Sequence, residues 1–223
     1  MKIRAAKILR CLPAGFVLLG LLGLFGPARG GAQTTDLDTR VKAFLESHDW
    51  GMGDMNVPSV DGRTLHEIIL KNKYTRALEI GTSTGHSGIW IAWALSKTGG
   101  KLTTIDIDEG RHREALENFK AAGLSHVIDA RLGDAHEIVP ALAGPFDFVF
   151  SDADKDWYTN YLKAVLPKLV EGGCFTTHNV SMGRGRRGGG SGGYMDYLLG
   201  LPELETTVDN RGNGLAVSYK KAK

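Results

Sequence analysis

The 223-residue sequence lacks three features, and each absence excludes a class of protein. It has only two cysteines, Cys11 and Cys174, which excludes the disulfide framework of a small secreted domain. Its longest apolar stretch, Leu12–Phe25, is about 14 residues, short of the roughly 20 that a membrane-spanning helix needs. It also lacks an excess of either charge, because 27 basic and 25 acidic residues give a net charge of +2. We therefore expect no nucleic-acid partner.

The first 32 residues have the layout of a secretory signal peptide. A basic start at Lys2, Arg4, Lys7 and Arg10 precedes the apolar stretch, and the small residues Gly30–Ala32 follow it. We expect Ala32 to be the last residue removed, which leaves a single domain over residues 33–223 and an exported protein, periplasmic or secreted. The alternative is an uncleaved N-terminal membrane anchor.

Removal of this segment would change the charge and the cysteine count. The remaining chain would have 22 basic and 25 acidic residues, a net charge of −3. Cys174 would be its single cysteine, so the exported protein would fold without an intramolecular disulfide. Cys174 lies in an apolar strand pattern and is interpreted as a small core residue rather than a catalytic thiol.

The rest of the chain alternates between helix and strand patterns, which predicts a Rossmann-like α/β fold with a mostly parallel sheet. A final pair of strands around the turn 209–214 predicts an antiparallel hairpin, for seven strands in all. The expected strands are 77–80, 101–105, 127–131, 146–151, 173–178, 204–208 and 215–219. The expected helices are 36–48, 59–71, 89–96, 111–122, 135–142 and 158–170.

The most informative segment is Arg76–Gly88, where an apolar strand ends in Glu79 and a Gly-x-x-x-Gly turn leads into a helix. Such a turn holds a small cofactor at the carboxyl end of the strand. A dinucleotide fingerprint has a glycine in the middle of the turn to admit a pyrophosphate, and Ser83 stands there instead. This favours a cationic, phosphate-free cofactor such as S-adenosylmethionine over a nicotinamide dinucleotide.

Acidic residues follow the next two strands. Asp106 ends the second strand, where a carboxylate can accept hydrogen bonds from both ribose hydroxyls of a nucleoside. Asp108 is interpreted as the cap of the helix that begins near Glu109. Asp134 follows the third strand and either accepts from an adenine amine or caps a helix. The expected cofactor contacts at these turns are Gly81, Ser83, Gly85, Ser87, Asp106, Ile107, Asp134, Ala135 and Asp152.

A third polar cluster follows the fourth and fifth strands. Asp152 and Lys155 belong to a run with three acids and a lysine within five positions, and His178-Asn179 end the neighbouring strand. Carboxylate, imidazole and amide groups can converge on a divalent cation. The alternative for Lys155 is an ion pair with a neighbouring aspartate.

At these residues the chain resembles the cation-dependent O-methyltransferases, which include catechol and caffeoyl-CoA O-methyltransferases. The resemblance covers about residues 56–220 and is carried by Glu79-x-Gly81-x-x-x-Gly85-x-Ser87, by Asp152-Ala153-Asp154-Lys155 and by Gly172-Gly173 before Asn179. It implies a class I methyltransferase fold, with cofactor contacts at Val57, Glu79, Gly81, Ser87 and Asp106. It also implies Asp152 and Asn179 as metal ligands and Lys155 as the base near the substrate hydroxyl.

One residue departs from the family pattern: His178 stands where the family has aspartate. Imidazole is a softer donor than carboxylate, so we expect a preference for manganese, iron or zinc over magnesium, or no metal at all. The Gly- and Arg-rich stretch 181–193 is interpreted as a solvated loop, with contact to an anionic acceptor as the alternative.

The function that the sequence favours is S-adenosylmethionine-dependent O-methylation of a small hydroxylated acceptor, catechol-like in the family, with Lys155 and Asp152 as catalytic residues. The alternatives are a non-catalytic protein that keeps the fold to bind a ligand, and a nicotinamide-dependent oxidoreductase, which Ser83 disfavours. Apart from an N-terminal anchor we expect no membrane contact. A homodimer is compatible with the sequence, which does not determine the oligomeric state.

Overall fold

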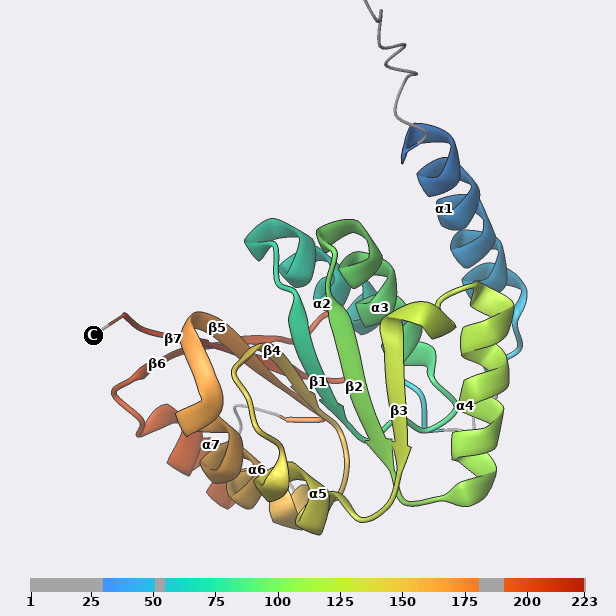
Figure 1. Ribbon diagram of the computed structural model, residues 1–223. Helices are drawn as coiled ribbons and strands as arrows, with labels where there is room; N and C mark the ends of the chain where they lie inside the picture. The colour runs from blue at the N-terminus through green and yellow to red at the C-terminus, as the bar shows by residue number, and fades with distance from the viewer. Residues whose placement is uncertain (1–29, 51–54, 181–190, 223) are drawn as a thin grey trace, which may run out of the picture.

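A computed structural model describes residues 30–50, 55–180 and 191–222, and these form an α/β sandwich (Figure 1). Its seven-stranded sheet has the order β3-β2-β1-β4-β5-β7-β6. The strands are β1 (Arg76–Ile80), β2 (Lys101–Asp106), β3 (Ile128–Leu132), β4 (Phe146–Ser151), β5 (Leu169–His178), β6 (Leu204–Asp209) and β7 (Leu215–Lys220). The expected number of strands and the C-terminal hairpin are confirmed, since β7 alone runs antiparallel to both of its neighbours.

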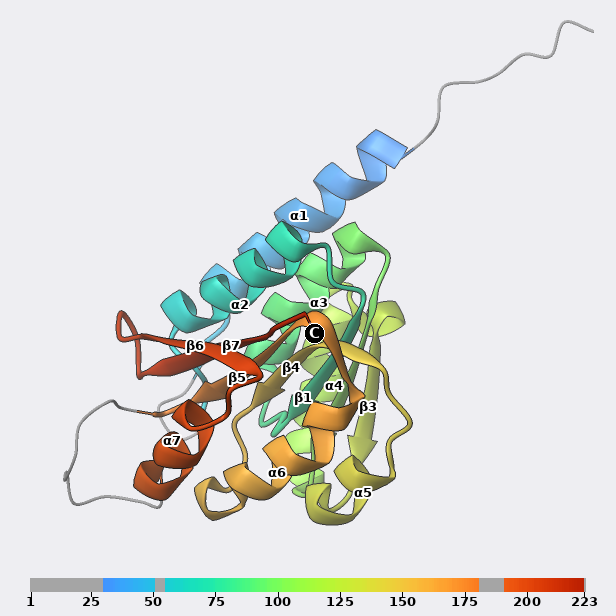
Figure 2. The same cartoon turned by 90° about the vertical axis from the view of Figure 1, so that its left-hand side faces the viewer.

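Helices cover both faces of this sheet (Figure 2). One face carries α1 (Gly30–Ser47), α2 (Ser59–Asn72), α3 (His86–Thr98) and α4 (Glu109–Ala122). The other face carries α5 (Ala135–Ala141), α6 (Tyr158–Val165) and α7 (Ser191–Leu199). The described residues also form three short 3₁₀ turns: η1 (Ser125–Val127), η2 (Lys155–Trp157) and η3 (Leu166–Lys168).

Each face of the sheet has its own apolar core. On the α1–α4 side, α3 is buried on every side over Ile89–Leu95, because it lies between the sheet and helices α1 and α2. Its apolar pattern is therefore continuous rather than periodic, as expected of a helix without a solvent face. On the other side, the fully buried Tyr158 and Tyr161 of α6 pack with Phe175 of β5.

The order of the strands positions the functional residues. β1 pairs in parallel with both β2 and β4, and β5 pairs in parallel with β4. The carboxyl ends of these four strands therefore meet at one edge of the sheet, on both sides of the point where the strand order reverses. In open α/β sheets this is where ligands bind.

Three expected elements differ from the structure. The predicted helix 158–170 ends at Val165, because Pro167 cannot continue it, and β5 already begins at Leu169. The predicted loop 181–193 is too long: residues 181–190 lie outside the described part, but Ser191 begins α7. The first predicted helix, 36–48, is α1 and begins six residues earlier, at Gly30.

Helix α7 begins with glycines, which have a low helix propensity, so the sequence pattern does not predict it. Tertiary contacts hold it in place. Tyr194, Met195 and Leu198 are buried, and the hydroxyl groups of Tyr194 and Thr177 lie 2.5 Å apart. Packing of the apolar side of α7 against α6 and β6 therefore outweighs the low helix propensity of its first turn. Among the described residues, no helix is both long and apolar enough to cross a membrane.

Candidate functional site

A cavity of about 810 Å³ opens at the carboxyl ends of β1, β2, β4 and β5. Twelve of the site residues predicted from the sequence line it. They are Val57, Gly81, Ser83, Ser87, Asp106, Ile107, Asp134, Ala135, Asp152, Lys155, His178 and Asn179. The fold thus brings the expected cofactor residues and the expected acceptor-side residues into one cavity.

The glycine turn after β1 forms one wall of this cavity. Gly81 and Gly85 have φ angles of +98° and +95°, and Ser83 has a φ of +48°. A Cβ atom on Gly81 would lie 2.6 Å from the carbonyl oxygen of Asp152, so only glycine lets the turns after β1 and β4 come this close. Ser83 lines the cavity at the position where a dinucleotide fingerprint has glycine.

Asp106 holds the glycine turn and faces the cavity. Its Oδ2 accepts a hydrogen bond from the Ser83 backbone N–H at 2.7 Å, and its Oδ1 accepts from the Asp108 N–H at 2.9 Å. Asp108 caps α4, as predicted, by accepting from the Arg111 N–H. A carboxylate has about four acceptor positions, so Asp106 keeps capacity for a ligand hydroxyl.

Asp134 also caps a helix, since its carboxylate accepts the His136 N–H at 2.8 Å at the start of α5. It lines the cavity as well, so one of the two interpretations is confirmed and the contact with adenine stays a prediction. Next to it, the His136 ring stacks on Trp157 at a centroid distance of 4.0 Å, and its Nε2 lies 3.0 Å from Oδ2 of Asp154. Sequence reasoning did not identify this aromatic wall.

Glu79 and Gly85 do not line the cavity, although the sequence placed both in the cofactor site. Glu79 is fully buried behind the glycine turn, and Thr104 donates to its Oε2 at 2.6 Å. Burial raises the pKa of Glu79 to about 7, against the opposing hydrogen bonds of Ser87 and Thr104. Gly85 packs against the ring of Phe119. Both residues thus brace the turn from behind.

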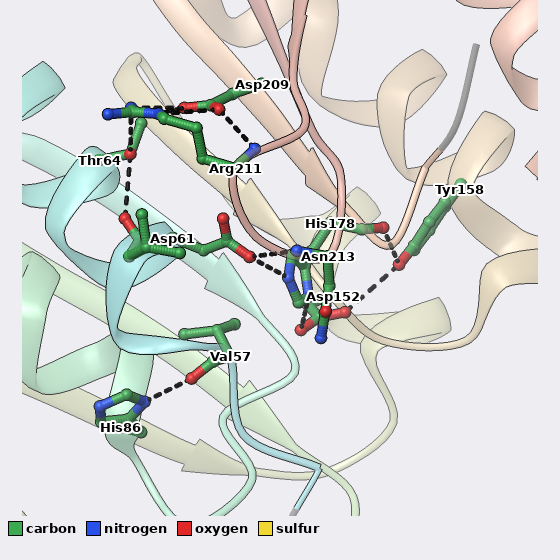
Figure 3. Close-up of polar contacts among 11 residues, drawn as sticks. Val57, Asp61, Thr64, His86, Asp152, Tyr158, His178, Asp209, Arg211 and Asn213 are labelled. Atoms are coloured by element: carbon green, nitrogen blue, oxygen red, sulfur yellow. Dashed lines mark hydrogen bonds and ion pairs between the residues drawn. The ribbon is translucent and has the colours of Figure 1, made fainter.

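On the acceptor side, His178 lies between two aspartates (Figure 3). Its Nδ1 is 2.9 Å from Oδ2 of Asp152, and its Nε2 is 2.9 Å from Oδ2 of Asp61. All three are nearly sequestered from solvent, with side chains 3%, 13% and 1% exposed for His178, Asp152 and Asp61. Burial by itself lowers the pKa of His178, but the hydrogen bonds and charges of Asp152 and Asp61 outweigh it and raise that pKa.

The three candidate metal ligands do not present a free donor set. A metal-binding imidazole offers a nitrogen lone pair, but each ring nitrogen of His178 faces a carboxylate oxygen, which can only accept a proton in a hydrogen bond. In the part of the chain that the structure describes, no group of three or more His, Cys, Asp and Glu side chains is arranged to hold an ion. Asn179, in the left-handed region with a φ of +55°, lines the cavity beside this network.

Asp61 is the functional residue that sequence reasoning missed. It lies in the first turn of α2, is 117 positions from His178, and also accepts the Asn213 backbone N–H at 3.0 Å from the β6–β7 turn. No sequence motif contains it, because its partners come from distant parts of the chain. Its position as an acid among the apolar residues of α2 was the one available signal.

The sheet order and the glycine turn after β1 together define a class I methyltransferase fold. A family model described as O-methyltransferase matches residues 37–185, so the chain belongs to this family. It is 37% identical over 134 residues to a catechol O-methyltransferase of Niastella koreensis, which covers 58% of this chain and 60% of that protein. It is 33% identical over 146 residues to a caffeoyl-CoA O-methyltransferase of Zinnia elegans, and the alignment covers 63% of this chain and 58% of that protein.

These matches span less than two thirds of the curated relatives' own lengths. A solved structure gives wider coverage: the O-methyltransferase TomG from Streptomyces achromogenes, in complex with S-adenosylmethionine, superposes with a TM-score of 0.67. It is 28% identical and covers 83% of this chain and 89% of its own. The fold of the family thus extends over most of the described residues.

Proposed function

We propose that the protein is an S-adenosylmethionine-dependent O-methyltransferase that acts on a small hydroxylated acceptor. The observation that carries the proposal is one cavity with two chemically distinct ends. One end has Asp106 and the glycine turn, in which Ser83 replaces the middle glycine of a dinucleotide site. The other end has Asp152 and Lys155. Family membership and the cofactor of TomG support the same function.

The cofactor end fits the nucleoside of S-adenosylmethionine. Asp106 would accept from the ribose hydroxyls, and Asp134 and His136 would border the adenine. The Ser83 turn leaves the methionine end of the cofactor near Asp152, whose carboxylate suits a cationic ligand.

The reaction joins the acceptor oxygen to the methyl carbon. As this C–O bond forms, the bond from the methyl carbon to the sulfonium sulfur breaks, and S-adenosylhomocysteine leaves with the electron pair. The acceptor proton must go to a base, and we assign that role to Lys155, because it lines the same cavity as Asp152. The protein otherwise contributes by holding the two reactants in line.

The acceptor class is inferred from the relatives. Since catechol and caffeoyl-CoA derivatives are both phenols, the first acceptor to test is a catechol. An aromatic diol is also small enough to share an 810 Å³ cavity with the cofactor.

Two measurements test this function. Calorimetry with S-adenosylmethionine, S-adenosylhomocysteine and NADH should show binding of the first two and none of the third. Mass spectrometry of a catechol incubated with enzyme and S-adenosylmethionine should then show a gain of one methyl group. Binding without transfer to any phenol would favour the non-catalytic alternative, and NADH binding would favour the oxidoreductase.

We also propose that residues 1–32 direct export, as a signal peptide or as an N-terminal anchor. The basic start and the apolar stretch support this, and residues 1–29 lie outside the described part of the structure. Helix α1, which begins at Gly30, packs on α3 and α4 of the described domain.

A further inference from the structure

His178 is the one residue of the acceptor side that departs from the family pattern, and its contacts are unlike those of a metal ligand. Both ring nitrogens lie 2.9 Å from a carboxylate oxygen, one of Asp61 and one of Asp152. Each ring nitrogen is therefore already engaged by a carboxylate oxygen, and neither is left unpartnered as a donor for a metal.

The burial of the two acids supports the same arrangement. The side chains of Asp61 and Asp152 are 1% and 13% exposed, and acids so nearly buried need a hydrogen-bonding partner that satisfies their oxygens. Among the described residues, the basic group placed between them is the His178 ring. A divalent ion would serve the same purpose, but the ring already occupies the space between the carboxylates.

Asp61 also fixes the orientation of the His178 ring. It accepts the Asn213 backbone N–H in addition to His178. The β6–β7 turn lies so close to Asp61 that a Cβ atom added to Gly212 would be 2.1 Å from Asp61 Oδ1. The carboxylate is therefore fixed by α2 on one side and by the hairpin turn on the other, and it holds His178 Nε2 in turn.

We propose that His178, bound by Asp61 and Asp152, stands in place of a divalent cation, so that this chain carries out its methyl transfer without a metal. The inference rests on the proposed function only where it concerns methyl transfer, since metal binding can be measured independently of activity. In this arrangement His178 is a positioning residue: it holds Asp152, which lines the cavity, and leaves Asp152 Oδ1 for other partners.

The experiment is a metal titration of the full chain after removal of ions with a chelator. Free Mn²⁺ is followed by electron paramagnetic resonance and Zn²⁺ by calorimetry. The wild type should show no stoichiometric site for either ion. The His178→Asp variant restores an Asp-Asp-Asn oxygen set and should bind one Mn²⁺ per chain, tighter by about 100-fold or more, since even an outer-shell change alters metal affinity by roughly 10- to 100-fold.

Two further variants assign the effect to this site. His126→Asp makes the same change of residue on the exposed η1 turn, away from the cavity, and should gain no ion. Asp152→Asn combined with His178→Asp should lose the ion that the single variant gained. Thermal unfolding of each variant checks that the titration was made on folded protein. If a variant does not fold, the titration of the wild type alone still tests whether the chain binds a metal.

One Mn²⁺ or Zn²⁺ bound per wild-type chain, and lost in Asp152→Asn, would overturn the proposal. It would show that Nδ1 of His178 is a ligand and that Asp61 fixes its other nitrogen. Loss of methyl transfer on chelation and its recovery with one metal would overturn it equally. Failure of the proposed function looks different: neither S-adenosylhomocysteine nor S-adenosylmethionine would bind, while the metal titration would keep its meaning.

Discussion

The indole N–H of Trp90 donates a hydrogen bond to Nε2 of His86 at 3.2 Å. Because an indole nitrogen can only donate, this ring nitrogen of His86 must carry a lone pair. The other ring nitrogen, Nδ1, donates to the Val57 carbonyl at 2.9 Å and so fixes the segment that enters the cavity wall. His86 is therefore neutral, and the partners of its ring fix its tautomer.

This neutral ring predicts a loss of stability in acid. Burial lowers the pKa of His86 to about 4 from 6.5, so the unfolded chain takes up a proton first as the pH falls. The contribution of His86 should decline between about pH 6.5 and 4 and level off below, by up to about 3 kcal/mol at 1.36 kcal/mol per pKa unit. Glu79 acts in the opposite sense, because its pKa of about 7 makes the folded chain gain that proton first, so the His86 contribution is read from the difference between wild type and a variant. Urea unfolding at pH 7.5, 5.5 and 4 measures it.

His86→Gln is the matched variant, because its amide can still donate to Val57 and accept from Trp90 but does not titrate. Its stability should fall less steeply over the same range. Part of the slope should remain, since burial also lowers the pKa of His66 to about 4. An identical slope in the variant would show that His86 is not protonated on unfolding in this range.

Asp106→Ala should weaken S-adenosylhomocysteine binding by roughly 1–3 kcal/mol, the cost of a buried hydrogen bond left unmade. It should also loosen the glycine turn, since Ser83 donates to Asp106. Asp108→Ala is the control, because Asp108 is exposed and caps α4 without lining the cavity. Calorimetry should separate the two, and equal affinity in both variants would remove Asp106 from the cofactor site.

Gly81→Ala should abolish cofactor binding, because its Cβ atom would meet the Asp152 carbonyl at 2.6 Å while φ stays at +98°. Gly99→Ala shares only the backbone strain: its φ is +77° and no atom lies within 4 Å of the added methyl. That variant should lose about 1–2 kcal/mol of stability and keep its affinity. Normal cofactor affinity in Gly81→Ala would mean that the two turns can separate freely.

Lys155→Met should lower kcat by about 100-fold or more and leave S-adenosylhomocysteine affinity unchanged, as expected for a group that acts only as a base. Lys71→Met removes an exposed lysine at the end of α2 and should change neither value. Single-turnover methylation of a catechol provides the rate. A Lys155→Met enzyme with full kcat would assign the proton to solvent or to another group.

The N-terminus offers a prediction on processing. Mass spectrometry of protein from the native host should find a mature chain that begins at or near Gln33, because Gly30–Ala32 supplies small residues at the expected cleavage point. An anchored protein would keep Met1 and sediment with membranes. An intact Met1 in a soluble cytoplasmic fraction would contradict both forms of the export proposal.

Much of the fold could be predicted because local pattern and global structure agree. The strands β1, β2 and β4 begin or end within one residue of prediction, since each is a short apolar run bounded by charge, glycine or proline. Helix α7 could not be predicted from propensity, because its stability comes from buried contacts of Tyr194 and Leu198 with elements that precede it. The helix expected up to residue 170 failed for a local reason, Pro167, that was present in the sequence.

The site residues likewise fall into those whose roles a sequence shows and those whose roles depend on the fold. Asp106 and Asp108 follow one another in the chain, and their different roles arise from their positions at a strand end and before a helix, which a sequence shows. Asp61 and His178 are held together only by the sheet order and the hairpin turn. For that reason the sequence indicated a histidine among metal ligands, whereas the structure presents a ring between two carboxylates.

The contact of Asp61 with Asn213 also has a consequence for the order of assembly during synthesis. The two residues are 152 positions apart, so Asp61 remains without this partner until the C-terminal hairpin has left the ribosome. Contacts that close such long loops form late in folding. A nascent chain that already contains the whole cofactor half therefore still lacks one of the two contacts that hold the Asp61 carboxylate.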